Sequence, residues 1–280
     1  MAQVINTNVM SINSQRVLMN SQSSMATSLE RLSSGLRINR AKDDAAGLAI
    51  SQRFTAQIRG LEQTNRNAND GISLLQTAEG ALDEVTNMLQ RMRELTVQSM
   101  NGTVSNSDKN SLSDEYNELK AEIDRIFDST EFNGTNLLGT NASLTMQVGF
   151  KAGASYQIKI STAALQTKTL ASGGLNSILG QASIGSAGQA GSLVAMLDTA
   201  INNISAKRAD FGAKQNRLEA TVRNNANVIE NQSAARSRVM DTDFAKETAN
   251  LTRTQILQQA GTAMLAQANA LPQNVLSLLG

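Results

Sequence analysis

Apolar side chains at heptad spacing near both ends are the most informative chemical feature of the chain. They provide no catalytic group, and what they can do is associate with other helices. Neither strip contains an aromatic residue, so each forms a narrow stripe of the kind that pairs with another helix. We expect the two ends to pair with each other and with copies of the same chain. The residues predicted to carry this self-association are Leu18, Met25, Leu29, Leu32, Leu36, Leu257, Met264, Leu265, Ala268, Leu271, Val275 and Leu278.

The side chains that usually perform acid–base or nucleophilic catalysis are missing. The chain contains no His and no Cys, which removes imidazole bases, thiol nucleophiles, disulfides and the zinc sites built on these residues. Carboxylate-only catalysis remains formally possible. The sequence therefore favours a structural protein, with no catalytic, cofactor or metal-binding residues to nominate.

Composition points to an elongated architecture. The 280 residues include 3% aromatic residues and no Trp, so few large side chains are available to anchor a compact core. A formal net charge of +1 argues against a nucleic-acid-binding protein, which usually shows a clear basic excess. No stretch reaches the roughly 18 apolar residues of a membrane span. The first residues lack a basic segment followed by an apolar one, so we expect no Sec-type signal peptide.

Two long periodic runs predict a helical rod in the interior of the chain. From Ile58 to Leu95 apolar residues keep heptad spacing, so one helix of about 50 residues would span roughly 75 Å. A run from Leu193 to Ile229 matches it in length and is its expected partner. The segment 36–50 interrupts the periodicity with clustered charge and small residues, and we interpret it as a connector between two layers.

Shorter elements follow the first long run. Residues 101–108 contain the turn residues that end it, and Ser107 is the expected N-cap of a second helix over 112–126 that folds back on the first. Residues 131–136 predict a turn. Apolar residues then alternate with polar ones in 144–150 and 156–160, which predicts a β-hairpin near 143–161. Pro272 is expected to interrupt or kink the terminal helix.

Four stretches resemble bacterial flagellin, the subunit of the flagellar filament, and they occur in the order found in that family. They are residues 32–50, 70–82, 130–134 and 263–269, and the resemblance covers 1 to about 140 and about 190 to 280. It implies a mainly α fold: a long antiparallel helical rod and coiled coil from paired N- and C-terminal segments, with a small β-hairpin in the middle. The middle of the chain is too short for the outer domains of larger flagellins.

The domain organisation that we expect from this resemblance has three parts. Residues 1–44 and 236–280 would form a terminal coiled-coil domain in the filament core, and 45–170 with 193–235 a rod-like helical domain. Residues 171–192, which include six Gly among Ser, Ala and Gln, would form a flexible outer segment. The terminal segments would be disordered in the monomer and fold on assembly.

The resemblance also implies partners and a location. The chain would leave the bacterium unfolded through the flagellar type III apparatus and assemble outside the cell for swimming. Its C-terminal segment would bind a flagellar export chaperone, and the filament cap and hook-junction proteins would be further partners, with neither nucleic acid nor membrane among them.

A receptor site is implied as well. The stretch 89–98 is similar to the flagellin surface bound by Toll-like receptor 5 of animals. This similarity assigns receptor contacts to Arg91, Leu95 and Glu115, with Gln90 and Gln98 beside them.

Three other readings compete with a filament subunit. A hook–filament junction protein shares the terminal heptads, although the rod stretches favour flagellin. A secreted metallopeptidase needs His-Glu-x-x-His, which a chain without His cannot supply. A free-standing receptor ligand is a third class, but no sequence feature predicts an action apart from the filament.

Overall fold

The computed structural model describes residues 7–139, 143–161 and 187–276, with the backbone alone described for 161, 187–189 and 271–276. This part of the chain is mainly α, as predicted, with long helices α1 (Val9–Ser34), α2 (Ala45–Ser99), α3 (Asn106–Ser129), α5 (Ala187–Met240) and α6 (Phe244–Leu276). It divides into two compact units, one from both ends of the chain (up to 58 and from 230 onward) and one from 59–229. Among the described residues, no helix is both long and apolar enough to cross a lipid bilayer.

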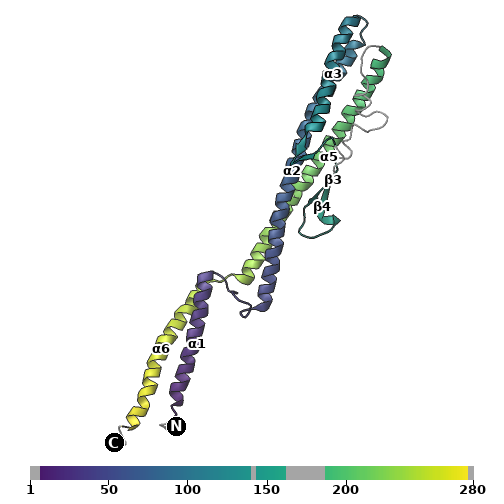
Figure 1. Cartoon of the computed structure of the whole chain (residues 1–280). Coiled ribbons are helices and arrows are strands. Elements are labelled where there is room, and N and C mark those ends of the chain that lie inside the picture. The colour runs from purple at the N-terminus through teal and green to yellow at the C-terminus, as the bar shows by residue number, and fades with distance from the viewer. Residues whose placement is uncertain (1–6, 140–142, 162–186, 277–280) are drawn as a thin grey trace. The chain divides into compact units, whose positions relative to one another are not determined.

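In the unit built from the chain ends, α1 and α6 lie side by side and antiparallel (Figure 1). α1 ends at Gly35, whose positive φ of 71° suits a residue without a Cβ. Two backbone hydrogen bonds then join the segment after α1 to the segment before α6. The Arg37 amide donates to the Met240 carbonyl, and the Thr242 amide donates to the Gly35 carbonyl. These bonds hold the start of α6 beside the end of α1.

The connector between α1 and α2 is shorter than the segment 36–50 that we expected. α2 begins at Ala45, because the Asp44 carboxylate accepts a hydrogen bond from the Gly47 amide at 2.8 Å and so caps the first turn. Before it, the Asp43 carboxylate accepts from the amides of Asn39 and Arg40. The bond from Arg40 is the main reason that the pKa of Asp43 is lowered.

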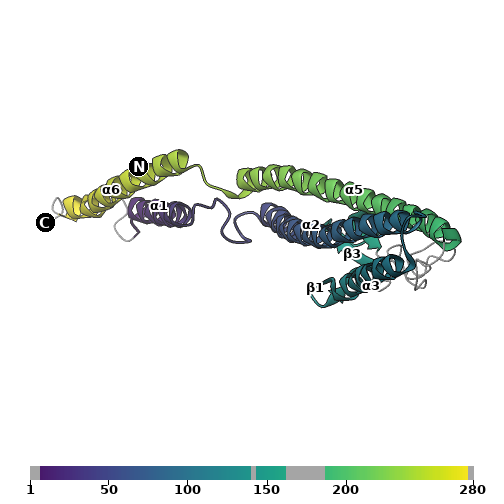
Figure 2. The same cartoon turned by 90° about the horizontal axis from the view of Figure 1, so that it is seen from above.

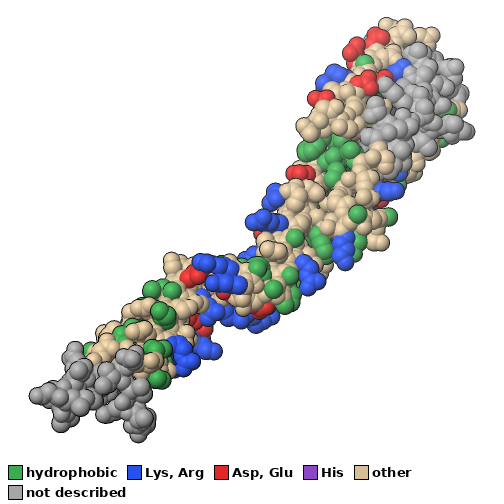
Figure 3. Space-filling model, turned by 60° about the horizontal axis from the view of Figure 1, so that its bottom comes forward, with side chains coloured by type: hydrophobic (Ala, Val, Ile, Leu, Met, Phe, Trp, Pro, Cys, Tyr) green, Lys and Arg blue, Asp and Glu red, His purple; other side chains and the backbone are tan. Residues whose placement is uncertain are grey.

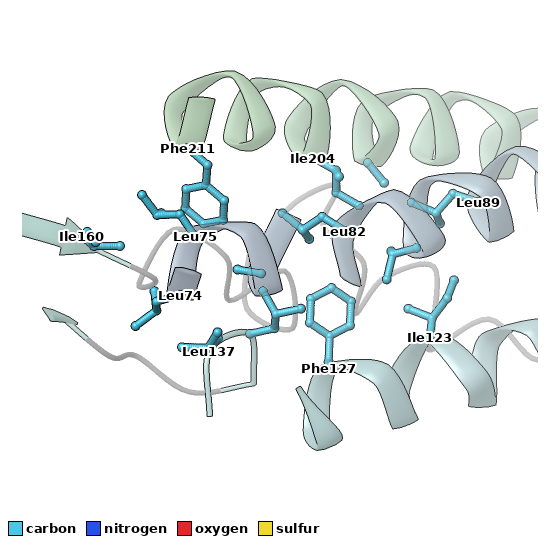
Figure 4. Close-up of a cluster of buried hydrophobic side chains, with 14 of the residues drawn as sticks. Leu74, Leu75, Leu82, Leu89, Ile123, Phe127, Leu137, Ile160, Ile204 and Phe211 are labelled. Carbon is cyan, nitrogen blue, oxygen red and sulfur yellow. The ribbon is translucent and has the colours of Figure 1, made fainter. Parts of the chain in front are cut away.

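The second unit is built on α2, with α3 on one side and α5 on another (Figure 2). Leu82 and Leu89 of α2 meet residues of α3 and α5 in one hydrophobic core (Figure 4), which also includes Ile123, Phe127, Ile204 and Phe211. Two ion pairs join α2 to α5 at the edge of this core. Arg93 binds Asp198 at 2.6 Å, and Asp83 binds Arg208 at 2.9 Å. The predicted pairing of the two long helices is therefore confirmed.

Ser105, and not Ser107, is the N-cap of α3. The Ser105 hydroxyl accepts from the Asp108 amide at 3.2 Å, and the Asp108 carboxylate accepts from the Ser105 amide at 3.2 Å. This reciprocal pair needs an acidic or amide side chain three residues after the cap that can reach back to it. Asp108 stands at that distance from Ser105, so the prediction of Ser107 was wrong.

Two small β-hairpins follow α3. β1 (Glu131–Phe132) pairs with β2 (Thr135–Asn136) across Asn133 and Gly134, whose positive φ values of 50° and 74° are those of a tight hairpin turn. β3 (Ser143–Gln147) pairs antiparallel with β4 (Gln157–Ser161), with Leu144 opposite Ile160. The predicted hairpin near 143–161 is thus confirmed, and a short 3-10 helix, η1 (Ala154–Tyr156), precedes its second strand.

Side-chain amides fasten this hairpin to the helices. Asn67 of α2 donates to the Gln147 carbonyl at 3.1 Å. Asn225 of α5 is buried and donates to the Val148 carbonyl, directly after β3, at 3.4 Å and to Asn65 of α2 at 3.1 Å. Buried amides need such partners, so these bonds stabilise one position of the hairpin against α2 and α5.

Candidate self-association and receptor-binding surfaces

The contact between α1 and α6 follows a heptad pattern, but small polar residues fill much of it. On α1 the residues that turn toward α6 step by three and four: Ser11, Ser14, Leu18, Ser21, Met25, Ser28 and Leu32. On α6 the matching row is Glu247, Leu251, Thr254, Gln258, Gly261, Leu265 and Ala268. Gly261 allows a close approach, because a Cβ there would lie 3.3 Å from Cδ1 of Leu18. We call these two rows the seam.

Five of the predicted self-association residues lie in this seam and three do not. Leu18, Met25, Leu32, Leu265 and Ala268 are in it. Leu29, Leu257 and Met264 point away from it and are exposed, Met264 by 60%. As intramolecular seam residues these three were wrongly predicted, because on both α1 and α6 apolar residues also occupy the stripe next to the seam, and the sequence analysis did not separate the two stripes. Their role in contacts between copies stays a prediction.

The remaining predicted residues are outside the helical seam or outside the described side chains. Leu36 follows the end of α1 and forms a β-bridge with Asp241. The side chains of Leu271 and Val275 and the whole of Leu278 are not among those described. α6 is helical to Leu276, so the expectation that Pro272 interrupts it was wrong, whereas a kink at Pro272 stays a prediction.

A buried polar cluster at one end of the seam was missed by the sequence analysis. Ser28 of α1 donates to Oε1 of Glu247 at 2.6 Å, and Arg31 lies 3.8 Å from the other carboxylate oxygen. Glu247 is only 7% exposed, and a buried carboxylate needs partners, which Ser28 and Arg31 provide. The regular interval of Ser14, Ser21 and Ser28 was the signal that could have revealed a polar seam.

On α2 and α3, polar residues of the predicted receptor patch are brought together. Nε of Arg91 donates to Oε1 of Glu115 at 2.9 Å, and Nη1 donates to Glu94 at 3.1 Å. The hydrogen bond with Glu115, followed by that with Glu94, raises the pKa of Arg91. Gln90, Arg91, Gln98 and Glu115 are all exposed and available to a partner.

Leu95 does not belong to that surface. Its side chain is fully buried in the core of the unit, with 0% exposure. The expectation that Leu95 contacts a receptor directly was wrong, because a step of four residues rotates the side chain by about 40° from Arg91, enough to turn it from the rim into the core.

Comparison with known proteins assigns the chain to a family. Two family models match, the bacterial flagellin N-terminal helical region over residues 5–143 and the bacterial flagellin C-terminal helical region over residues 194–279. The chain belongs to the bacterial flagellin family. It is therefore a structural subunit of the flagellar filament and not an enzyme, and the resemblance noted in the sequence is confirmed.

Individual relatives agree with this assignment over their full length. A flagellin of Halalkalibacterium halodurans is 47% identical over 277 residues, covering 99% of each chain. The flagellar filament 33 kDa core protein of Treponema phagedenis is 45% identical over 286 residues, again covering 99% of each. A solved structure of a putative flagellar hook-associated protein from Vibrio parahaemolyticus shares the fold, with a TM-score of 0.62 at 13% identity over 71% of this chain and all of the other.

Proposed function

We propose that this flagellin polymerises through its α1–α6 pair, forming the core of an extracellular filament used for swimming. The observation that supports this proposal is the apolar surface left after the seam has formed. Val9, Met10, Ile12 and Met19 of α1 are each more than half exposed, as are Ile256 and Met264 of α6. So many large apolar side chains on two helices favour burial against another protein surface.

Truncation tests this role directly. Removing residues 1–40 or 245–280 deletes one helix of the pair, so we expect a soluble rod unit that retains helical circular dichroism and forms no filaments by negative-stain electron microscopy. The matched control is a short tag inserted within 171–190, where we expect filaments to persist. Filaments from either truncated chain would contradict the proposal.

Export and its partners form a further part of the proposal. We infer that the chain passes unfolded through the flagellar type III apparatus and that a chaperone holds the C-terminal segment, where α6 carries its exposed apolar residues, until then. The filament cap and hook-junction proteins would meet the same terminal helices. Size-exclusion chromatography of the purified chain with its cognate export chaperone, compared with the chain lacking 245–280, tests the chaperone contact.

We also propose that the chain is a ligand of Toll-like receptor 5 through Arg91, Glu115, Gln90 and Gln98. The supporting observation is that Arg91 is exposed yet held in place by Glu115 and Glu94, so it could bind a partner with little loss of side-chain entropy. Arg91→Ala should weaken receptor signalling by at least tenfold, or about 1.4 kcal/mol. Monomers should signal and intact filaments should not, whereas an unchanged response from a folded Arg91→Ala monomer would contradict the patch.

A hook–filament junction protein remains the alternative within the same family. The relatives named flagellin and filament core protein favour a filament subunit, while the hook-associated neighbour shares only the fold. Growth distinguishes the two roles, because a filament subunit extends seeds without limit and a junction protein stops after a thin layer. Seeded growth followed by electron microscopy gives the answer.

A further inference from the structure

A helical polymer needs two different contact surfaces on every subunit. A head-to-tail contact that does not close into a ring joins one patch to a different patch of the next copy, and only such contacts build an open filament. If the chain polymerises through α1 and α6, as proposed above, both patches must lie on that pair of helices.

The first surface lies along one edge of the seam. Met10, Val17 and Arg31 repeat at multiples of seven residues and so form one row on α1. Arg31 reaches Glu247 of α6, which places this row at the edge of α1 that borders α6. Because the helices are antiparallel, the equivalent row of α6, Leu257 and Met264, lies on the same side. We call Met10, Val17, Leu257 and Met264 the Leu257 face.

The seam beside the Leu257 face is lined by small residues. The seam positions nearest this edge are Ser14, Ser21, Thr254, Gly261 and Ala268. Larger seam residues such as Leu18 and Leu265 occupy the other edge. Small residues between apolar rims let another helix approach closely and insert its own side chains, as knobs enter holes in a coiled coil.

The opposite edge of the same pair is mainly polar. Ser11 donates to Asn269 at 2.7 Å there, and the rows that run along this edge contain Gln15, Gln22 and Leu29 on α1 and Gln255 and Thr262 on α6. Apart from Leu29, which is 49% exposed, the named residues of this edge are amides and hydroxyls, so the pair is more apolar on the other side of its seam. This asymmetry favours one side for burial.

The second surface is on the back of α1. Ile12 and Met19 repeat at seven residues and are 56% and 68% exposed, with Val9 beside them. We call Val9, Ile12 and Met19 the Met19 face. Ile12 and Val17 are five residues apart, so the two faces are separated by about 140° around α1. Hydrophobic side chains are visible among polar ones on the surface of the terminal pair (Figure 3).

We propose that the Met19 face of one copy docks on the Leu257 face of the next. Both faces repeat at seven residues, about 10 Å along a helix, so side chains of one can fit between those of the other over successive turns. The faces point in different directions, so each subunit can use both at once, as a head-to-tail contact requires.

The absence of Cys from the chain makes a clean crosslinking test possible. Filaments are assembled from the double variant Met19→Cys/Met264→Cys, treated with a short bis-maleimide and separated on a denaturing gel. The double variant should give a ladder of covalent multimers longer than dimers, since each copy carries both halves. The single variants should stay monomeric alone and give only dimers when mixed before assembly.

A matched control and a substitute variant complete the test. Met19→Cys/Thr262→Cys places the second thiol on the polar edge, two residues from Met264, and should give no ladder. If Met19→Cys blocks assembly, Ile12→Cys takes its place on the same row, and Leu257→Cys takes the place of Met264→Cys as the second thiol. Dimers from the Met264→Cys variant alone, a ladder from the Thr262 control, or no ladder with either Met264 or Leu257 would each overturn the docking.

The outcome separates this inference from the proposed function. If the unaltered chain forms no filaments, polymerisation itself fails. If it forms filaments and the crosslinks are absent, polymerisation stands and the assignment of the two faces is wrong.

Discussion

The side-chain amide of Asn8 donates to the carbonyl of Ala268 at 2.7 Å, across the α1–α6 pair. This carbonyl is four residues before Pro272, which has no N–H to complete the usual helical hydrogen bond. The same Asn8 side chain accepts from the Ser11 amide and caps α1. The Asn8 side chain therefore has two roles: its oxygen caps α1, and its NH2 group gives the Ala268 carbonyl the hydrogen bond that Pro272 cannot provide. This hydrogen bond helps α6 continue to Leu276.

A double-mutant cycle between Asn8 and Pro272 tests this relationship. Asn8→Ser keeps a capping oxygen but loses the amide donor, so it should destabilise the filament by about 1 kcal/mol per subunit. In a Pro272→Ala background the backbone N–H gained at that position satisfies the Ala268 carbonyl, and the same change at Asn8 should cost less. The critical concentration for assembly measures the cost of Asn8→Ser in each background. Equal costs in the two backgrounds would mean that Asn8 and Pro272 are independent.

Glu247 should matter more than an exposed glutamate elsewhere. Glu247→Ala leaves the buried Ser28 hydroxyl and the Arg31 guanidinium without their partner, at a cost of about 1–3 kcal/mol. This should raise the critical concentration for assembly roughly 5- to 150-fold. Glu219→Ala is the control, since Glu219 is exposed and pairs with Arg223 one turn away, and it should change assembly little.

The capping of α3 separates two serines that are two residues apart. Ser105→Ala removes the hydroxyl that accepts from the Asp108 amide and should lower the free energy of unfolding by about 1 kcal/mol. Ser107→Ala should leave it nearly unchanged, because this serine lies inside the first turn. Urea unfolding followed by circular dichroism compares the two, and a larger effect at Ser107 would contradict the assignment.

The sequence predicted the helices and the β3–β4 hairpin well because their signals are local. Heptad spacing in α2 and α5, and alternation around Leu144 and Ile160, follow from the periods of helix and strand. The N-cap was misplaced because several residues of 101–108 suit a turn, and only the reciprocal bond of Ser105 with Asp108 singles one out.

The candidate surfaces were harder to predict, because whether an apolar side chain is buried depends on which residues of the other helix pack against it. Met264 and Ala268 both fit a heptad, yet the first is exposed and the second buried. The choice depends on Gly261 and the serines of α1, which allow the backbones to approach closely. Glu247 was missed for the same reason, since its partner Ser28 is distant in sequence.

The buried position of Leu95 predicts a stability defect and no separate receptor defect. Leu95→Ala should lower the free energy of unfolding by about 2–5 kcal/mol, as expected for truncating a fully buried leucine. Receptor activation should fall only as the folded fraction falls, in contrast to Arg91→Ala. Thermal unfolding and a reporter assay well below the unfolding midpoint of the variant distinguish these effects. A folded Leu95→Ala monomer with reduced signalling would restore Leu95 to the contact surface.

Tyr116 should make the second unit sensitive to alkali. Its side chain is 1% exposed, and its hydroxyl makes no hydrogen bond with any residue that the structure describes. Burial raises the pKa of this hydroxyl, so the folded state disfavours the phenolate, while the unfolded state ionises near its ordinary pKa of about 10. The contribution of Tyr116 to the free energy of unfolding is therefore fully present below about pH 10, and it is lost as the pH rises toward the higher pKa of the folded state.

Replacing this tyrosine with phenylalanine tests the alkaline sensitivity. Tyr116→Phe removes a group that must otherwise be buried uncharged and unpaired, so the free energy of unfolding at pH 7 should be unchanged or higher by up to about 1 kcal/mol. Between about pH 9 and 11 the variant should lose less stability than the unaltered chain, as measured by urea unfolding at each pH. An equal loss in both, or a clear destabilisation of the variant at pH 7, would mean that the hydroxyl has a partner in the folded protein.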